Sequence, residues 1–260
     1  MSGLSLAVRQ CPDHESTAGS ADEKTPAVAS KRQGQAVVGG AMGSLRVIEI
    51  QLVAFVVVFS ASGLVPLIDL AFPAFATLYV LALSRFAFPA VGSGGGRELF
   101  RGSRAFRAYV VAGTTVGLFL PLAYVLGGFA RGDDHAVRAA APHLFLLSCQ
   151  ILTENVVSGM EIFSPPVRAI VVLLYTVRRV FIIVDWIYIV WASKTLPLNA
   201  SVDDVAWIWF GRVLSTANLL YFSINLFAFL IPRFLPTAFE KYFKEREEID
   251  AKAVEDKKGD

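Results

Sequence analysis

Long apolar stretches separated by short polar segments make up most of the chain from residue 47 onward. A helix that crosses the hydrocarbon core of a bilayer needs about 20 mostly apolar residues. Six stretches approach this length, and we expect a transmembrane helix in each. They cover residues 46–66, 70–88, 108–129, 142–163, 167–192 and 207–231. The pattern predicts an all-α fold, a multi-pass transmembrane helical bundle of about six spans.

The fourth and fifth stretches fit this pattern least well. Polar side chains interrupt the fourth, namely Gln150, Glu154, Asn155 and Glu161. The fifth would be about 39 Å long as one straight helix, against a hydrocarbon core of about 30 Å. Either this helix tilts, with Arg178 and Arg179 at the interface or in a polar interior, or residues 167–177 lie along the interface and the span is 180–196. We favour the second arrangement slightly.

The two ends of the chain lack this apolar character. Residues 1–44 are polar without apolar periodicity, which predicts a disordered cytoplasmic tail. Residues 45–232 form the predicted membrane domain, with a kink expected at Pro121. Residues 233–260 form a charged, amphipathic cytoplasmic tail, expected to be part helix and part disordered. We expect the last span to end at Pro232.

The distribution of basic residues predicts the orientation. Most of the 24 lysines and arginines fall in the two tails and in the loop between the second and third spans, the arrangement of cytoplasmic segments. Both termini are therefore predicted to be cytoplasmic. Removing the fourth span would place the basic C-terminal tail on the other side. The loop carries four arginines that could contact anionic lipid, namely Arg97, Arg101, Arg104 and Arg107.

The loop between the fifth and sixth spans has features of the opposite membrane surface. All four tryptophans flank it, namely Trp186, Trp191, Trp207 and Trp209. Tryptophan is enriched where the bilayer meets water. The tripeptide Asn199-Ala200-Ser201 in this loop is a glycosylation sequon, which requires the lumenal side. Whether Asn199 is glycosylated stays open.

Composition agrees with membrane residence. Hydrophobic residues make up 55% of the chain and charged residues 18%, and the mean hydropathy is +0.55. A net charge of +2 gives no reason to expect a nucleic-acid partner. The chain lacks the sequence motifs of common hydrolases, nucleotide-binding loops and zinc sites, so we predict no enzymatic activity, no cofactor and no metal. Four residues could in principle hold a divalent cation, but a solvated polar turn is the favoured reading: Asp133, Asp134, His135 and His143.

Charged and amide side chains inside the predicted spans form the candidate functional site. A charge at the bilayer centre costs roughly 2.5 to 3.5 kcal/mol on insertion scales, so such residues are paired or have a function. We call the set the polar seam: Glu154, Glu161, Arg178, Arg179, Asp185, Arg212, Asn218 and Asn225. The favoured reading is a static network that locks spans four, five and six together. The other is a polar pathway or ligand site. Gly113 and Gly117 predict close helix packing.

Four segments resemble a known family: AAAPHLFLLSCQ at 139–150, YTVRRVFIIVDW at 175–186, GRVLSTANLL at 211–220 and NLFAFLIPRFLP at 225–236. They are similar to an uncharacterised plant family of multi-pass membrane proteins, grouped as a domain of unknown function. The similarity covers roughly residues 46–245. It implies plant origin and membrane residence, and it brings no assigned activity.

Taken together, these patterns predict an integral membrane protein of the plasma membrane or an endomembrane. Its partner is the lipid bilayer, and assembly into a homo-oligomer is left open. We expect a non-enzymatic structural or interaction protein whose polar seam is internal. The alternative is a small transporter or channel that uses the seam as a polar pathway.

Overall fold

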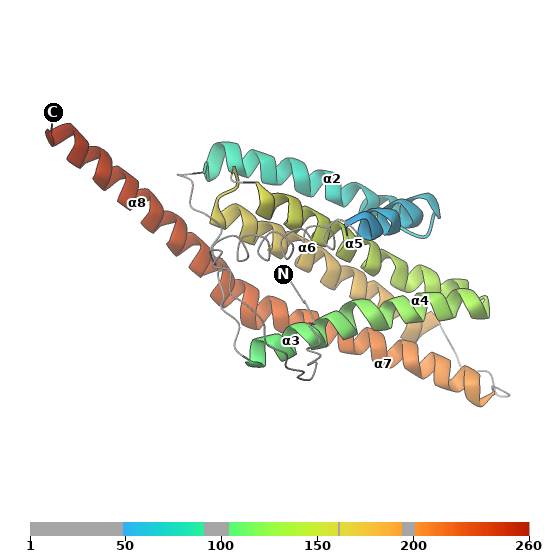
Figure 1. Cartoon of the computed structure of the whole chain (residues 1–260). Helices are drawn as coiled ribbons and strands as arrows, with labels where there is room; N and C mark the ends of the chain where they lie inside the picture. The colour runs from blue at the N-terminus through green and yellow to red at the C-terminus, as the bar shows by residue number, and fades with distance from the viewer. Residues whose placement is uncertain (1–48, 91–103, 161, 194–200, 260) are drawn as a thin grey trace, which may run out of the picture. The chain divides into compact units, whose positions relative to one another are not determined.

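Every element that the computed structural model describes is helical, over residues 49–90, 104–160, 162–193 and 201–259 (Figure 1). The chain divides into a unit of residues 1–46 and a unit of residues 47–260, and the described residues all belong to the second. In chain order the elements are a helix Glu49–Ala61; α2 (Leu67–Ala82) with the π-helical turn η1 (Leu83–Ala87); α3 (Arg104–Thr114), η2 (Thr115–Phe119) and α4 (Leu120–Arg131); α5 (Asp134–Gly159); α6 (Pro165–Tyr188) and η3 (Ile189–Ser193); α7 (Val202–Ile224), η4 (Asn225–Phe234) and α8 (Leu235–Gly259).

The predicted all-α fold is confirmed within these residues. Four helices are long and apolar enough to cross a membrane, and they cover Leu67–Ala87, Val111–Arg131, Asp134–Gly159 and Val202–Lys252. The helix Glu49–Ala61 is apolar but shorter. Helix α6 is long enough, but charged side chains interrupt its apolar stretch. The number of spans therefore stays a prediction.

The turn between the first two helices differs from the expected one. The first helix ends at Ala61 rather than at residue 66, and Gly63 adopts a positive φ of 67° in the turn that follows. Such a conformation favours glycine because a Cβ atom would be strained there. Pro66 precedes α2 as its N-cap. Asp69, which falls in the gap between the first two predicted spans, lies in the first turn of α2 and is buried.

Helix α5 begins eight residues earlier than the predicted 142 and ends at Gly159 rather than at 163. Its start is fixed by Asp133, whose side chain accepts a hydrogen bond from the backbone N–H of Ala136 at 3.1 Å. This is an N-cap, which satisfies a backbone donor that has no partner within the helix. The hydropathy pattern missed this turn because the first residues of α5 are polar.

Two prolines that we expected to bend or end a helix are instead accommodated by π-helical turns. η2 lies just before Pro121, and η4 contains Pro232, after which α8 continues to Gly259. Proline lacks the N–H that an α-helix needs, and a π turn shifts the local hydrogen bonds. The described residues up to Gly259 are thus helical beyond Pro232, where we expected the last span to end, and the end of that span in a membrane stays a prediction.

Helix α6 is unbroken through Arg178 and Arg179. The backbone has no helix boundary near residue 177, where the slightly favoured arrangement would begin a separate span. Its geometry is that of one helix from residue 165 to 188, continued by η3. The depth of residues 167–177 in a membrane stays a prediction.

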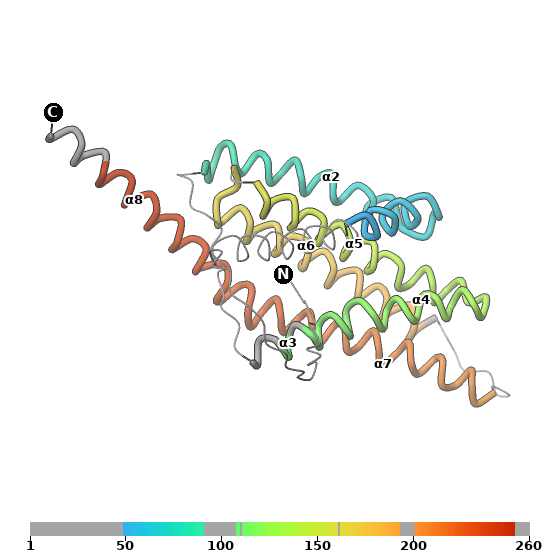
Figure 2. The backbone as a smooth tube through the Cα atoms, viewed as in Figure 1, coloured from blue at the N-terminus to red at the C-terminus, as the bar shows by residue number. Residues whose placement is uncertain are grey.

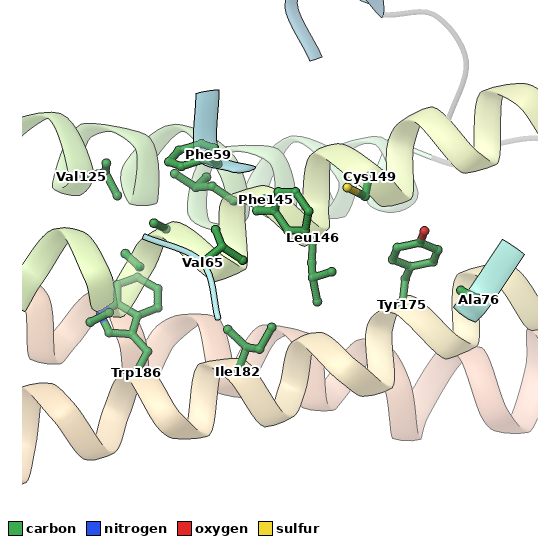
Figure 3. Close-up of a cluster of buried hydrophobic side chains, with 14 of the residues drawn as sticks. Phe59, Val65, Ala76, Val125, Phe145, Leu146, Cys149, Tyr175, Ile182 and Trp186 are labelled. Carbon is green, nitrogen blue, oxygen red and sulfur yellow. The ribbon is translucent and has the colours of Figure 1, made fainter. Parts of the chain in front are cut away.

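Helices α5 and α6 lie side by side and antiparallel at the centre of this unit, and most of α5 is buried (Figures 1 and 2). Successive contacts between them join Thr153 to Tyr175, Gln150 to Arg179 and His143 to Trp186. Residue numbers rise on one helix as they fall on the other. Figure 3 shows Leu146 of α5 and Ile182 and Trp186 of α6 pointing into the space between the two helices.

The remaining helices surround this pair. Helix α2 packs on α5 and α6, and the ring of Phe72 meets that of Tyr175 edge to face at 5.3 Å between centroids. Helix α4 packs on α5, whereas α7 packs on α6 and α4. Tyr124 of α4 joins these elements, because its ring stacks on that of Trp207 at 4.8 Å and lies 5.8 Å from that of Trp186.

Candidate functional site

Arg178 of α6 is paired with Asp69 of α2. Both its Nε and its Nη2 donate to Oδ1 of Asp69, at 2.9 and 2.6 Å. The carboxylate is buried, with 4% of its side chain exposed, whereas the arginine side chain is 24% exposed. The anion of this pair is therefore not one of the polar seam residues. The expected network among spans four, five and six does not include Arg178, which ties α6 to α2 instead.

Arg179, the next residue, lies on another face of α6 because successive residues on a helix are about 100° apart. Its Nη2 donates to Oε1 of Gln150 at 2.6 Å, and the amide nitrogen of Gln150 donates to Oε1 of Glu154 at 2.6 Å. The guanidinium also lies 4.2 Å from the centroid of the Phe222 ring. These contacts join α5, α6 and α7, the helices of the fourth, fifth and sixth predicted spans, through an amide and an aromatic ring.

His143, which we considered among four residues that could hold a divalent cation, is fully buried inside α5. Its Nε2 lies 2.8 Å from the backbone oxygen of Gly117. A carbonyl oxygen only accepts, so Nε2 carries the hydrogen. Gly117 belongs to the π turn that precedes Pro121, so the histidine of α5 bonds to the backbone of this turn.

Asn218 of α7 likewise bonds to the preceding carbonyl of this turn. Its Nδ2 donates to the backbone oxygen of Val116 at 3.0 Å and to that of Leu214 at 2.9 Å. Nearby, the hydroxyl of Tyr221 donates to the backbone oxygen of Tyr109 at 3.2 Å. The polar face of α7 is thus directed at the helix that contains the π turn, and it holds the two helices in register.

These contacts define an interior polar column made of Glu154, Gln150, Arg179, His143 and Asn218, which lies between α5, α6, α7 and η2. Several buried polar atoms of α5, α6 and α7 have no hydrogen-bond partner among the residues that the structure describes: His143 Nδ1, Thr176 Oγ1, Arg179 Nε, Arg179 Nη1, Trp186 Nε1 and Asn218 Oδ1. Donors and acceptors both occur in this set. Unsatisfied buried polar groups cost about 1 to 3 kcal/mol each, so a native protein seldom keeps them without a reason.

Other members of the polar seam lie away from the column. Asp185 is exposed on the outer face of α6. Arg212 donates from Nε to the backbone oxygen of Val190 at 3.2 Å, and its guanidinium lies over the rings of Trp191 and Trp209 at 5.0 and 5.5 Å. Asn225 is half-buried where α7 passes into η4. The seam predicted as one network is therefore divided among separate sites.

The glycines expected to allow close packing do so, but against side chains rather than against a neighbouring backbone. A Cβ atom at Gly113 would collide with the ring of Tyr221, and one at Gly117 would lie 2.9 Å from the ring of Phe222. Gly211 of α7 similarly makes room for Tyr124. The small residues accommodate large aromatic rings between α7 and the helix of η2 and α4.

Several predicted features lie outside the described residues, namely Arg97, Arg101, Glu161 and Asn199. The backbone of Arg104 and Arg107 belongs to α3, and their side chains are not described. Within the described part of the chain, no group of three or more histidine, cysteine, aspartate or glutamate residues is arranged to hold a metal ion. Cys149 is a buried free thiol.

Three residues that make these contacts, Asp69, Gln150 and His143, were not in the predicted polar seam. Asp69 falls between the first two predicted spans, and Gln150 was read as an interruption of the fourth span. His143, near the start of that span, was considered only among the residues that could hold a cation. Each is polar within an apolar helix, and this signal could have identified all three. The partners could not be assigned in the same way, because Asp69 and Arg178 are far apart in sequence.

Comparison with known proteins places most of this chain in one family. The family model described as Domain of unknown function (DUF7733) matches residues 43–243. That range includes the helices that build the polar column. No curated protein and no solved structure matches the chain.

Proposed function

We propose that this chain, which belongs to the DUF7733 family, is a multi-pass integral membrane protein with a structural or interaction role and no catalytic activity. The buried ion pair between Asp69 and Arg178 is the observation that supports this best. It joins two helices through charges that have little contact with solvent. Nε and Nη2 of Arg178 both donate to one carboxylate oxygen of Asp69. This arrangement is suited to holding two helices together rather than to reacting with a substrate.

The outer surface supports residence in a bilayer. Large apolar side chains are exposed on helices all around the described unit, among them Val58, Leu78, Phe129, Phe181, Leu220 and Phe227. Polar side chains are buried among the same helices. An exposed apolar surface of this extent is favourable against lipid and costly against water. The membrane is the plasma membrane or an endomembrane in this proposal, and plant origin stays what the resemblance implies.

Six spans with cytoplasmic termini are supported by contacts at the two ends of the helices. At one end, the ring of Phe88 meets those of Phe239 and Tyr242 in α8, and the hydroxyl of Ser164 donates to the backbone oxygen of Phe88. Ser164, Phe239 and Tyr242 fall in segments predicted to be cytoplasmic, and Phe88 is the last residue of the second predicted span, which ends on that side. At the other end, Arg131 pairs with Asp204 at 2.9 Å, and both residues belong to predicted lumenal segments. We infer that the helices alternate in direction across the bilayer.

Cysteine accessibility tests this topology. Single cysteines replace Glu98, Asn199 or Asp250 in a variant with Cys11→Ser and Cys149→Ala, and sealed vesicles are treated with a membrane-impermeant maleimide. We expect residues 98 and 250 to react from the same side and residue 199 from the other. Labelling of 98 and 250 from opposite sides would disprove the six-span arrangement.

A second candidate function is a small transporter or channel that follows the interior polar column. It is favoured by the unsatisfied polar atoms of Arg179, His143 and Asn218. Flux measurements in proteoliposomes separate the two roles. The structural role predicts that potassium, chloride and proton flux stay at the level of protein-free vesicles. A flux that Arg179→Lys abolishes, with folded protein retained, would replace the structural role by transport.

Anionic lipid remains a proposed partner through the basic loop. The relevant arginines are Arg97, Arg101, Arg104 and Arg107. Binding of liposomes that contain phosphatidylserine would fall with salt if the loop acts by electrostatic attraction. Homo-oligomer formation can be measured in the same preparations by mass photometry.

A further inference from the structure

The guanidinium of Arg179 has incomplete hydrogen bonding in an enclosed place. The residue is 3% exposed. Only Nη2 has a hydrogen-bond acceptor among the described residues, the amide oxygen of Gln150 at 2.6 Å. Nε and Nη1 are buried without a partner. A buried cation is stable only when an anion or several strong acceptors compensate it.

The carboxylate associated with Arg179 along the polar column reaches it indirectly. Glu154 accepts a hydrogen bond from the amide nitrogen of Gln150, while the amide oxygen of Gln150 accepts from Arg179. A neutral side chain thus separates the two charges. Glu154 is half-buried, so its carboxylate is at the outer end of this chain of bonds. The adjacent cation, Arg178, is already bound to Asp69 and is turned toward α2.

We propose that Arg179 and Gln150 form a binding site for a small monovalent anion of the halide or nitrate type, and that the carboxylate of Glu154 competes for this site. The proposal goes beyond the structural role, which does not require a ligand. Two N–H groups supply it: one of the two donors of Arg179, Nε or Nη1, that have no partner among the described residues, and Nε2 of Gln150, which now bonds to Glu154.

The chemistry of the surroundings selects the class of ligand. One cation is present and it lies against the apolar ring of Phe222. A single negative charge balances it, whereas a divalent phosphate would leave an excess charge in a buried place. The site requires that Glu154, which is half-buried, turns outward. The anion then accepts from the amide nitrogen of Gln150 in place of the carboxylate. Water in that position would satisfy the donors without balancing the charge.

Diffraction tests the position of the anion. The full chain is crystallised in bromide, and anomalous data are collected at the bromine absorption edge. We expect a bromide peak within hydrogen-bond distance of the guanidinium of Arg179 and the amide of Gln150. A map that shows only water there, or Glu154 bonded directly to Arg179 with bromide absent, overturns the proposal.

Thermal unfolding in detergent tests affinity in solution, with chloride replacing gluconate at constant ionic strength. A ligand that binds the folded state raises the midpoint temperature in a saturable manner. Glu154→Gln removes the competing charge, and we expect half-saturation at a chloride concentration lower by about tenfold, which corresponds to about 1.4 kcal/mol. Absence of a saturable chloride effect in both proteins overturns the proposal.

The neighbouring arginine provides a matched control. The double variant Asp69→Asn/Arg178→Gln removes an ion pair from the same helix but leaves the proposed site intact, so the chloride dependence should persist. Arg179→Gln should abolish it. If Arg179→Gln yields no folded protein, the chloride titration of Glu154→Gln and the bromide map still test the proposal. If the folded Arg179→Gln protein shows the same chloride dependence as the unaltered protein, the anion binds elsewhere and the proposal is overturned. None of these measurements depends on flux or topology.

Discussion

Replacing Arg178 with glutamine removes the cation that pairs with Asp69 and leaves the carboxylate in place. The two sides of this pair are unequally buried, because 4% of the Asp69 side chain is exposed against 24% for Arg178. A carboxylate that loses its partner cannot reach solvent without moving α2. A guanidinium that loses its partner can turn outward on its flexible stem. The structure therefore predicts unequal effects for the two single variants.

The expected magnitudes follow from burial. Arg178→Gln leaves an uncompensated buried charge and should lower the free energy of unfolding by about 3 to 5 kcal/mol. Asp69→Asn leaves a partly exposed cation and should lower it by about 1 to 3 kcal/mol. In the double variant two amides face each other without a charge, so the loss should be about 1 kcal/mol. The double variant is then more stable than the Arg178→Gln protein.

Unfolding in mixed micelles, followed by circular dichroism as the fraction of denaturing detergent rises, measures these free energies. The three variants and the unaltered protein form a double-mutant cycle, which isolates the coupling between the two residues. A coupling energy near zero would show that the pair does not hold α2 to α6. A larger loss for Asp69→Asn than for Arg178→Gln would refute the argument from burial.

Three further expectations concern packing and the helix ends. Gly211→Ala should lower the free energy of unfolding by about 1 to 3 kcal/mol, since the new Cβ would lie 2.5 Å from the hydroxyl of Tyr124; thermal unfolding against the unaltered protein checks it. Asp133→Ala should lower the free energy of unfolding by about 1 kcal/mol, because the N-cap of α5 is lost, and unchanged stability would argue against the cap. It should also change tryptophan fluorescence, because Trp207 donates to the Asp133 carboxylate at 2.9 Å. In a Cys11→Ser background, Cys149 should react with maleimide only after denaturation, and rapid labelling of the folded protein would contradict its burial.

The sequence indicated which polar residues form the candidate site, but it did not indicate which of them contact each other. Arg179, Glu154 and Asn218 stand out in the sequence because they are polar within apolar helices, and the structure places them along one column. The sequence offered Glu154, Glu161 and Asp185 as partners for the arginines. The observed partner of Arg178 comes from another helix. It is Asp69, which falls in the gap between the first two predicted spans.

Helix ends were also misread for physical reasons. Hydropathy responds to lipid-like composition, so it placed the start of the fourth span at 142, although the N-cap Asp133 starts the helix among polar residues. Pro232 was read as a stop, although a π-helical turn lets the chain continue as helix. Caps and π turns depend on individual hydrogen bonds, which an average over many residues does not register.

The sequence by itself determined the helical class, the approximate position of each apolar segment and the presence of interior charges, because these depend on composition and period along the chain. Tertiary structure alone decided which charges meet. Two adjacent arginines, Arg178 and Arg179, face different neighbours because successive side chains are about 100° apart on a helix, and the packing of α2, α5 and α7 around α6 determines what each one finds there.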